Sequence, residues 1–339
     1  MSRVSSRAHG PRMVDVAALA GVSQQTVSRV INGAPNVSPE IRERTEKAIA
    51  QLRYRRNTAA AALASNRTMN IGVVSYSLSV HGPSVALYGI SEQARRNGYS
   101  TRLITLGDVG RSSIRHALDE LTADEVDGII VLVPLGSAVE TLRGLDSRVP
   151  IVTFEQGSAP GASSVSIDEV HGAQLAVRHL LELGHETVAH VGGPEGWMAS
   201  EARERGWSTE LALARRVARP VLRTTDWSVA EGYRAGVELA ADPDVTAVFA
   251  ANDPFALGVI KAFDDHGIRV PADRSVVGFD DVPEAGYYRP SLSTVHLDFA
   301  EVGQLAVDRV FALMRGEAVE PLPLIAPTLV ARGSSAAPR

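Results

Sequence analysis

Apolar positions in the first part of the chain recur at helical spacing. Four of them share one face of a predicted helix: Val14, Val16, Ala17 and Ala20. Gly21 follows where a left-handed residue would end that helix, and Ser23 is placed to cap a second helix running to residue 32. The turn of three residues between them is the spacing of a helix-turn-helix. A third helix is predicted after Ser38, with Pro39 in its first turn.

Beyond residue 70 the pattern changes to short apolar runs typical of buried strands. These runs cover residues 71–74, 102–105, 128–133, 151–154, 187–191, 246–250 and 275–278. They alternate with amphipathic helices, which indicates parallel sheets covered on both faces. Gly98, Gly184 and Gly267 each stand where a glycine would close a helix before the next strand. Because this region is longer than a usual single domain of about 50–250 residues, we predict two similar lobes with a cleft between them.

The two regions are joined by an alanine-rich run at residues 58–64. Its composition strongly favours a helix, but an isolated helix of this length is only marginally stable in water. We therefore predict a conditional helix in this run, ordered only by DNA or by a partner copy of the chain.

The charge of the chain is divided between these regions. The formal net charge is −5, which on its own argues against a nucleic-acid partner. Residues 1–70, however, hold 11 basic and four acidic residues, a balance of +7, which leaves −12 for residues 71–339. This asymmetry predicts a basic binding module attached to an acidic body.

The composition excludes several classes of protein. With 45% hydrophobic and 22% charged residues, the chain is neither disordered nor fibrous. It contains no cysteine, so a disulfide framework, a thiolate metal site and a cysteine nucleophile are excluded. No signal-peptide core and no apolar run of about 18 residues occurs, so we expect a cytoplasmic protein without membrane insertion.

The second helix carries the side chains that a major-groove helix uses. Its polar surface holds Gln24, Gln25, Ser28, Arg29 and Asn32. Glutamine can bond adenine through two hydrogen bonds, and arginine can bond guanine in the same way. The alternative is a solvated amphipathic helix in a small bundle. Basic residues on the third helix, among them Arg42 and Lys47, suit phosphate contacts, which position a protein without specifying sequence.

Polar residues follow the predicted strands of the acidic body at the edge where open α/β folds bind ligands. Asn252 and Asp280 each begin such a segment, although helix capping and turn formation are equally good explanations. Arg203 lies in a predicted helix, where a surface salt bridge is the usual role. Trp227 is a bulky aromatic in a polar loop, and an aromatic face beside Asp, Asn and Arg is typical of a carbohydrate pocket.

The commonest enzyme fingerprints are missing. Neither Gly-x-Gly-x-x-Gly, Gly-x-x-x-x-Gly-Lys nor Gly-x-Ser-x-Gly occurs in the sequence. His185 and His190 come nearest to a metal motif, but their spacing is one residue too long for the zinc-protease pattern. We therefore expect no catalytic residue, metal or cofactor.

Residues 14–33 resemble the headpiece of the LacI/GalR family of bacterial repressors, and the alanine-rich run with Leu63 resembles its hinge helix. The resemblance extends from about residue 13 to residue 332. It implies a homodimer on a pseudo-palindromic operator, with the second helix in the major groove and Leu63 as a minor-groove wedge. The implied DNA contacts are Gln24, Gln25, Thr26, Ser28, Arg29, Asn32, Asn57, Ala60 and Leu63.

The resemblance also implies a core like that of periplasmic sugar-binding proteins, an α/β two-lobed fold behind an all-α headpiece. The expected organisation is a disordered arm (1–12), a headpiece (13–57), the hinge (58–70), a core (71–332) and a disordered tail (333–339). The lobes would comprise residues 71–167 with 298–326 and residues 168–296 with 327–332. Matching motifs place the effector contacts at Val80, Pro83, Glu155, Arg203, Trp227, Asn252, Asp280 and Phe299. Tyr76 and Ala199 stand where the family has small hydroxylated residues, and Tyr76 is large enough to shorten the pocket.

These features predict a repressor of carbohydrate-utilisation genes, associated with the nucleoid and released from DNA by a sugar such as a galactoside. A purine or other co-repressor is the alternative effector. A sugar-binding protein without DNA function is disfavoured, because it needs no headpiece. One member of the family joins its dimers through a C-terminal leucine-rich helix, and residues 330–339 carry no such pattern, so we expect a dimer.

Overall fold

The structure of the chain is a computed structural model that describes residues 11–31, 33–54, 67–123, 125–132, 147, 149–156 and 163–339. For residues 155 and 156 it describes the backbone alone. The chain divides into two compact units, one ending at Thr68 and the other beginning at Met69. The expected arm up to residue 10 and the expected hinge helix at 58–64 lie outside the described residues, as do Asn32, Asn57, Ala60 and Leu63.

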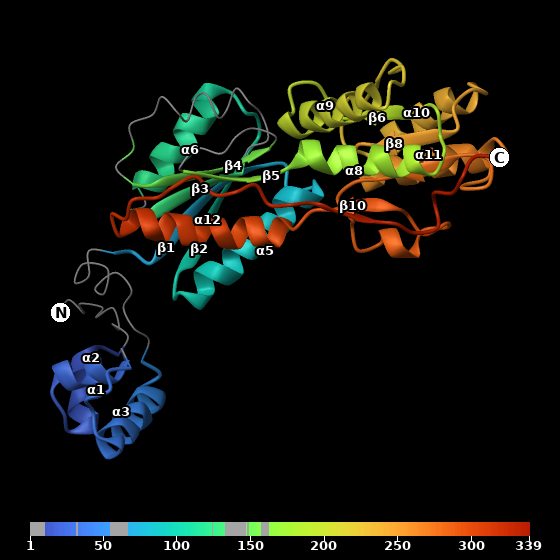
Figure 1. The fold of residues 1–339 in the computed structure, drawn as a ribbon. Helices are drawn as coiled ribbons and strands as arrows, with labels where there is room; N and C mark the ends of the chain where they lie inside the picture. Colours follow the sequence, from blue (N-terminus) through green and yellow to red (C-terminus); the bar gives the residue numbers. More distant parts are fainter. Residues whose placement is uncertain are drawn as a thin grey trace, which may run out of the picture. The chain divides into compact units, whose positions relative to one another are not determined.

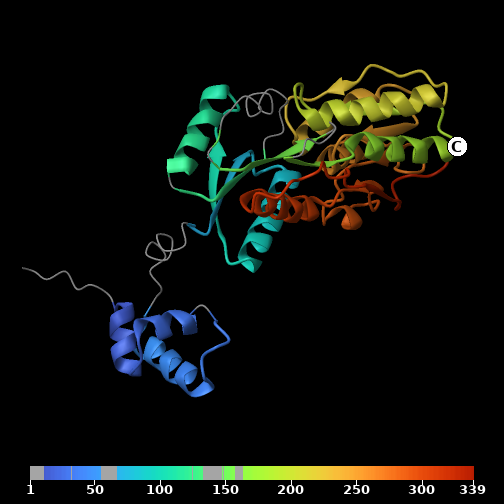
Figure 2. The ribbon, with the colours of Figure 1, turned by 60° about the vertical axis from the view of Figure 1, so that its left-hand side comes forward.

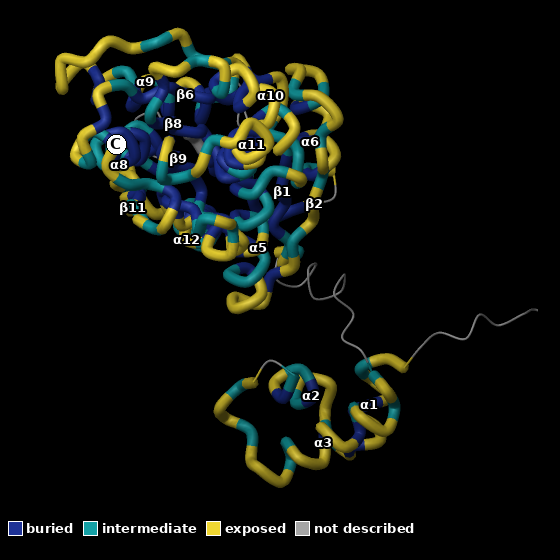
Figure 3. The backbone as a smooth tube through the Cα atoms, turned by 90° about the vertical axis from the view of Figure 1, so that its right-hand side faces the viewer, coloured by how far each residue is buried: buried dark blue, intermediate teal, exposed yellow. Residues whose placement is uncertain are grey.

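The first unit contains the three predicted helices, α1 (Met13–Ala20), α2 (Gln24–Ile31) and α3 (Pro39–Leu52). Gly21 ends α1 in the left-handed conformation at φ 64°. The hydroxyl of Ser23 accepts a hydrogen bond from the Thr26 N–H at 3.1 Å, and Ser38 caps α3 in the same way. Val16, Val27 and Ala48 form the centre of a small core between the helices, whose outer positions remain exposed (Figure 3). The predicted caps and the helix-turn-helix are confirmed.

The second unit begins with a parallel sheet in the order β2-β1-β3-β4-β5. Its strands are β1 (Asn70–Tyr76), β2 (Ser100–Leu106), β3 (Gly128–Leu132), β4 (Ile151–Gln156) and β5 (Ser164–Ile167). Helices α5 (His81–Arg96) and α12 (Phe299–Met314) cover one face, and α6 (Arg111–Ala123) covers the other (Figure 1). A Cβ on Gly89 of α5 would lie 2.3 Å from the Ala300 carbonyl oxygen, so the close contact of α5 and α12 requires glycine there. This sheet is the N-lobe.

A second parallel sheet, in the order β7-β6-β8-β9, forms the C-lobe. Its strands are β6 (Ala189–Gly192), β7 (Leu222–Arg223), β8 (Ala247–Ala250) and β9 (Ser275–Val277). Helices α8 (Glu169–Glu182) and α9 (Met198–Leu213) pack on one face, and α10 (Val229–Ala240) and α11 (Asp253–Asp265) pack on the other (Figure 2). Gly98, Gly184 and Gly267 have positive φ angles of 77°, 101° and 72° after their helices, as expected for closing glycines.

The chain crosses between the lobes after β5, before α12 and again before β11. After the last crossing, β11 (Thr328–Val330) pairs antiparallel with β10 (Thr294–His296). The apolar pattern did not predict this two-stranded ribbon. One cluster of buried apolar side chains continues from Ile90 and Val152 in the N-lobe, through Phe299, to Phe249 and Phe279 in the C-lobe. The lobes therefore share a hydrophobic core on the side where the crossings lie.

The expectation of a disordered tail at residues 333–339 is wrong. Ser334 is fully buried; its hydroxyl donates to the Val276 carbonyl oxygen at 2.6 Å and accepts from the Ser293 N–H at 2.8 Å. The Ser334 carbonyl oxygen accepts from the Val276 N–H at 2.8 Å. Because β9 is the edge strand of its sheet, this segment satisfies backbone groups that would otherwise be unpaired. Among the helices in the described ranges, none is both long and apolar enough to cross a membrane.

Candidate functional site

The exposed face of α2 carries the predicted base-reading side chains. Gln24, Gln25 and Arg29 are exposed, and Thr26 and Ser28 are half-buried. Val27 and Val30 are buried and fix which face of the helix points outward. Gln25 and Arg29 are four residues apart, so both can reach the same external surface. The hydroxyls of Ser23 and Thr26 lie 2.9 Å apart, which ties Thr26 to the helix cap.

Two basic residues of α3, Arg42 and Lys47, already contact groups of the headpiece. The Arg42 guanidinium donates to the Ala34 carbonyl oxygen at 2.7 Å, and thereby fastens the loop between α2 and α3. The Lys47 ammonium lies 2.7 Å from the Glu43 carboxylate on the exposed surface. An exposed pair of this kind contributes little to stability, so Lys47 remains available to an external phosphate.

A pocket enclosing about 340 Å³ of non-protein space, including open solvent, lies between the lobes of the core. It is lined by Val80, Gly82, Pro83, Trp197, Ala199, Arg203, Trp227, Asp280 and Phe299. The starts of α5 and α12 supply the N-lobe wall, and the C-lobe supplies the other. A Cβ on Gly82 would lie 2.7 Å from the Phe299 ring, which explains a glycine at this point of the wall.

The pocket brings together six of the eight side chains expected to contact an effector: Val80, Pro83, Arg203, Trp227, Asp280 and Phe299. The seventh, Glu155, lies in β4, and its side chain is outside the described atoms. The eighth, Asn252, caps α11: its Oδ1 accepts from the Phe255 N–H at 2.8 Å, and its Nδ2 donates to the Trp227 carbonyl oxygen at 3.3 Å. Asn252 therefore combines the capping role with anchoring of the loop that carries Trp227.

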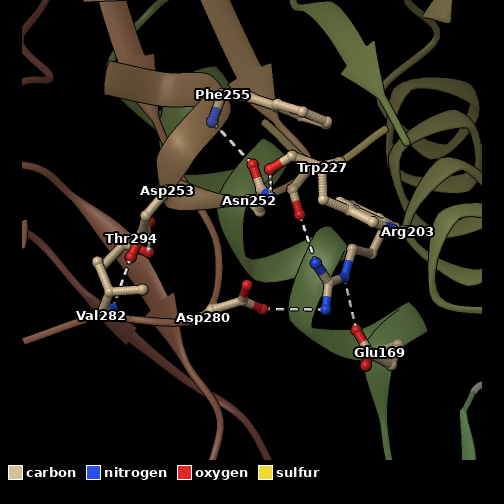
Figure 4. A network of polar contacts seen from close by, with 10 residues as sticks. Glu169, Arg203, Trp227, Asn252, Asp253, Phe255, Asp280, Val282 and Thr294 are labelled. Carbon is tan, nitrogen blue, oxygen red and sulfur yellow. Dashed lines mark hydrogen bonds and ion pairs between the residues drawn. The ribbon is translucent and has the colours of Figure 1, made fainter. Parts of the chain in front are cut away.

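Arg203 is held by three groups from different parts of the C-lobe (Figure 4). Its Nε donates to Glu169 Oε2 at 2.7 Å, its Nη2 lies 3.0 Å from Asp280 Oδ1, and its Nη1 donates to the Ala251 carbonyl oxygen. Its guanidinium carbon lies 4.1 Å from the centre of the Phe279 ring, a cation–π contact. Arg203 is therefore a fixed, preorganised hydrogen-bonding group at the pocket wall and not a surface salt bridge.

Burial shifts the ionisation of this network. It raises the pKa of Glu169 and raises the pKa of Asp280 to about 6, and Arg203 opposes both shifts. Burial disfavours the Arg203 cation, but the two carboxylates outweigh it and raise the Arg203 pKa. The cation and its carboxylates thus stabilise one another although all three side chains are buried.

Asp253, which follows Asn252, is a structural residue. It is fully buried, and its carboxylate accepts from the Thr294 hydroxyl at 2.6 Å and from the Val282 N–H at 2.8 Å (Figure 4). Burial, with Asp280 nearby, raises the pKa of Asp253 to about 8, against the effect of the Thr294 and Val282 hydrogen bonds. Asp253 joins α11 to β10 and to the turn after β9.

Two residues of this region were missed from the sequence. Trp197, at the start of α9, lines the pocket; its ring centre lies 5.5 Å from that of Trp227 and 6.1 Å from that of Tyr76. Tyr76, expected to shorten the pocket, packs against this second tryptophan. Trp197 directly follows Gly196, and a tryptophan in such a turn is the sequence feature from which this pocket residue could have been predicted. The other missed residue is Glu169, whose pairing with Arg203 spans 34 positions of sequence.

The chain is similar to known regulators over nearly its whole length. Residues 12–57 match the family model described as bacterial regulatory proteins, lacI family, and residues 177–335 match a periplasmic binding protein-like domain. The lactose operon repressor of Escherichia coli (strain K12) is 35% identical over 329 residues, covering 96% of this chain and 91% of that protein. A structure of the lac repressor dimer bound to operator and the anti-inducer ONPF matches with a TM-score of 0.86 and 34% identity, covering 97% of this chain and 100% of that one. A CelR–cellobiose complex matches with a TM-score of 0.69 and 29% identity, covering 96% and 99% of the two chains.

These similarities confirm the fold class, a helix-turn-helix headpiece joined to a two-lobed core of the periplasmic binding protein type. They agree with the exposed polar face of α2 and with the pocket between the lobes. The chain belongs to the lacI family of bacterial regulatory proteins, and it is a DNA-binding transcriptional regulator rather than an enzyme.

Proposed function

We propose that this regulator is a homodimer that represses carbohydrate-utilisation genes and is released from a pseudo-palindromic operator by a neutral sugar or glycoside. The interlobe pocket carries the proposal. Trp197 and Trp227 supply aromatic surface for the apolar face of a sugar ring, and Arg203 and Asp280 supply a donor and an acceptor for hydroxyls. The matched CelR structure contains cellobiose, which supports the same ligand class here.

On the DNA side, Gln24, Gln25 and Arg29 would contact base edges in the major groove, with Thr26, Ser28 and Asn32 beside them. Asn57, Ala60 and Leu63 would contact the operator from a hinge formed by residues 58–70, and the protein would act in the cytoplasm, on the nucleoid. Exposure of Gln24, Gln25 and Arg29 on one short helix supports this assignment.

Release of DNA would follow from linkage between the two sites. A ligand in the pocket contacts Pro83 and Phe299 from one lobe and Arg203 and Asp280 from the other, so it binds best to one arrangement of the lobes. By reciprocity, a ligand that favours the arrangement with lower DNA affinity must itself bind more weakly to the DNA complex.

The test begins with selection of an operator from random duplex DNA by the full-length protein. Operator affinity is then measured by fluorescence anisotropy with and without a panel of galactosides, cellobiose and purines. We expect a neutral sugar or glycoside to weaken operator binding, and we expect Trp227→Ala to abolish that response while operator binding persists. Tightening of operator binding by a purine, with no response to any sugar, would replace this proposal with the co-repressor alternative.

A further inference from the structure

The ion cluster beside the pocket holds more negative than positive groups. Within the described part of the chain, Arg203 is the one cationic side chain among the residues that line the pocket. Glu169 and Asp280 contact its guanidinium at 2.7 and 3.0 Å, and their exposed fractions are 0% and 5%. The 2.7 Å contact from Arg203 Nε to a Glu169 oxygen has the length of a charge-assisted hydrogen bond, in which the Arg203 cation favours the ionised carboxylate. The two carboxylates of the cluster therefore compensate the positive charge of Arg203.

The hydrogen-bonding capacity of Arg203 is only partly used. A guanidinium has five N–H donors; Nε and Nη1 of Arg203 each donate one hydrogen bond, to Glu169 and Ala251, and Nη2 lies 3.0 Å from Asp280 Oδ1. Because Arg203 lines the pocket, its N–H groups without a partner in the protein can donate to hydroxyl oxygens of a ligand. A neutral polyhydroxylated molecule thus finds donors on Arg203 and an acceptor on Asp280, whereas an anion meets a cluster whose charge is already balanced or negative.

Building on the proposed effector function, we infer that Glu169 restricts the pocket to uncharged ligands, so that free sugars and glycosides bind and phosphorylated sugars are rejected. A phosphate ester loses part of its hydration on entering the pocket and needs unpaired cations or donors in return. Glu169 does not line the pocket; it acts through Arg203 and is a positioning residue. For a singly charged ligand anion placed roughly 7 Å from a carboxylate charge, an effective dielectric constant of about 20 gives a change in affinity of roughly fiftyfold, which solvent screening reduces to about tenfold.

The chain offers a matched control for this residue. Glu210 of α9 pairs with Arg178 of α8 at 2.8 Å, so a second Glu–Arg pair joins the same two helices away from the pocket lining. Glu169→Gln and Glu210→Gln each remove one carboxylate and keep an oxygen that can accept from arginine. A loss of helix packing alone would affect both variants, whereas a change in ligand charge selectivity is expected for Glu169→Gln alone.

The experiment measures binding to the full-length protein by isothermal titration calorimetry. The probes are inorganic phosphate and two matched pairs, glucose with glucose 6-phosphate and galactose with galactose 6-phosphate. We expect the wild type and Glu210→Gln to bind no phosphorylated probe more tightly than its neutral partner. Glu169→Gln is expected to bind inorganic phosphate and the sugar phosphates about tenfold more tightly than the wild type does, with a dependence on salt concentration.

Two outcomes would overturn the inference. One is a wild-type protein that prefers a sugar phosphate to its neutral partner, a result that stands even if Glu169→Gln fails to fold. The other is a folded Glu169→Gln variant whose phosphate affinity equals that of the wild type. The inorganic phosphate titration needs no effector identity, so it decides this inference even if no sugar in the operator assay releases DNA and the proposed function fails.

Discussion

Replacing Arg203 with alanine should destabilise the core strongly, because it leaves Glu169 and Asp280 buried without their cation. Removing one partner of a buried ion pair typically costs about 3–5 kcal/mol, since the remaining charge is desolvated and uncompensated. Both carboxylates have exposed fractions of 5% or less, and the guanidinium also packs on the Phe279 ring, so we expect a loss of about 4 kcal/mol in the free energy of unfolding.

The loss should depend on pH. Burial already raises the pKa of both carboxyl groups against the opposing effect of Arg203, so without Arg203 their pKa values in the folded state rise further. A carboxyl whose pKa is higher in the folded than in the unfolded state stabilises the fold below the unfolded value, and this contribution is lost as the pH rises through the folded value. The destabilisation by Arg203→Ala should therefore be greater at pH 8 than at pH 5.5.

Urea unfolding followed by tryptophan fluorescence at the two pH values measures this effect. Arg178→Ala is the control: the Arg178 side chain is 43% exposed, so its loss should cost about 1 kcal/mol or less. Combining Arg203→Met with Glu169→Gln should restore part of the stability, because it removes one of the unpaired charges. A loss below about 1 kcal/mol for Arg203→Ala, or a loss equal at both pH values, would refute this account of the cluster.

Three further changes test other parts of the molecule. Arg29→Ala should weaken binding to the selected operator by about 1–3 kcal/mol and lower the preference for operator over random DNA, both measured by fluorescence anisotropy. Equal weakening on operator and random DNA would show that Arg29 contacts only phosphate. Burial lowers the pKa of His190 to about 4 from a usual value near 6.5, so the free energy of unfolding of the wild type should fall by about 3 kcal/mol between pH 7 and pH 4 through this residue. In urea unfolding, His190→Leu should show a weaker dependence of stability on pH. An unchanged dependence would show that His190 does not cause it. Deleting residues 334–339 should lower the melting temperature, since it uncovers the edge of β9; calorimetry with no change would show that the segment adds no stability.

The local chemistry of the chain was sufficient to predict the three helices of the headpiece and, in the core, strands β1 to β4, β6, β8 and β9. Gly21, Ser23 and Ser38 act within four residues of the backbone groups that they cap, so their roles follow from the sequence alone. Trp227 and Asp280 were found because a bulky and a charged side chain stood in polar segments after strands, and because their motifs resembled those of a family. Arg203 was found from the family motif alone, since its helical position suggested only a surface salt bridge. The same motifs identified Phe299, which has an ordinary apolar sequence context.

The features that were missed depend on contacts made far along the chain. Glu169 follows the capping Asp168, where an acid normally favours the helix dipole from the surface, and only the packing of α9 on α8 buries it against Arg203. The segment after residue 333 is rich in serine and alanine, a composition typical of loops, and it is ordered by the edge of β9. The strands β10 and β11 are three residues each and are defined by their pairing rather than by any periodicity.

The continuous core that links the lobes limits how this protein can respond to a ligand. Parting the lobes widely would expose Phe299, Leu297 and Phe279, all of which are at most 2% exposed, to water. At about 25 cal/mol per Å² of apolar surface, such an exposure costs more than a ligand that makes a few hydrogen bonds can supply. We therefore expect the effector to act by shear, in which packed helices slide over one another by small distances, and not by a wide hinge opening. Small-angle scattering of the core should then show nearly the same radius of gyration with and without the effector.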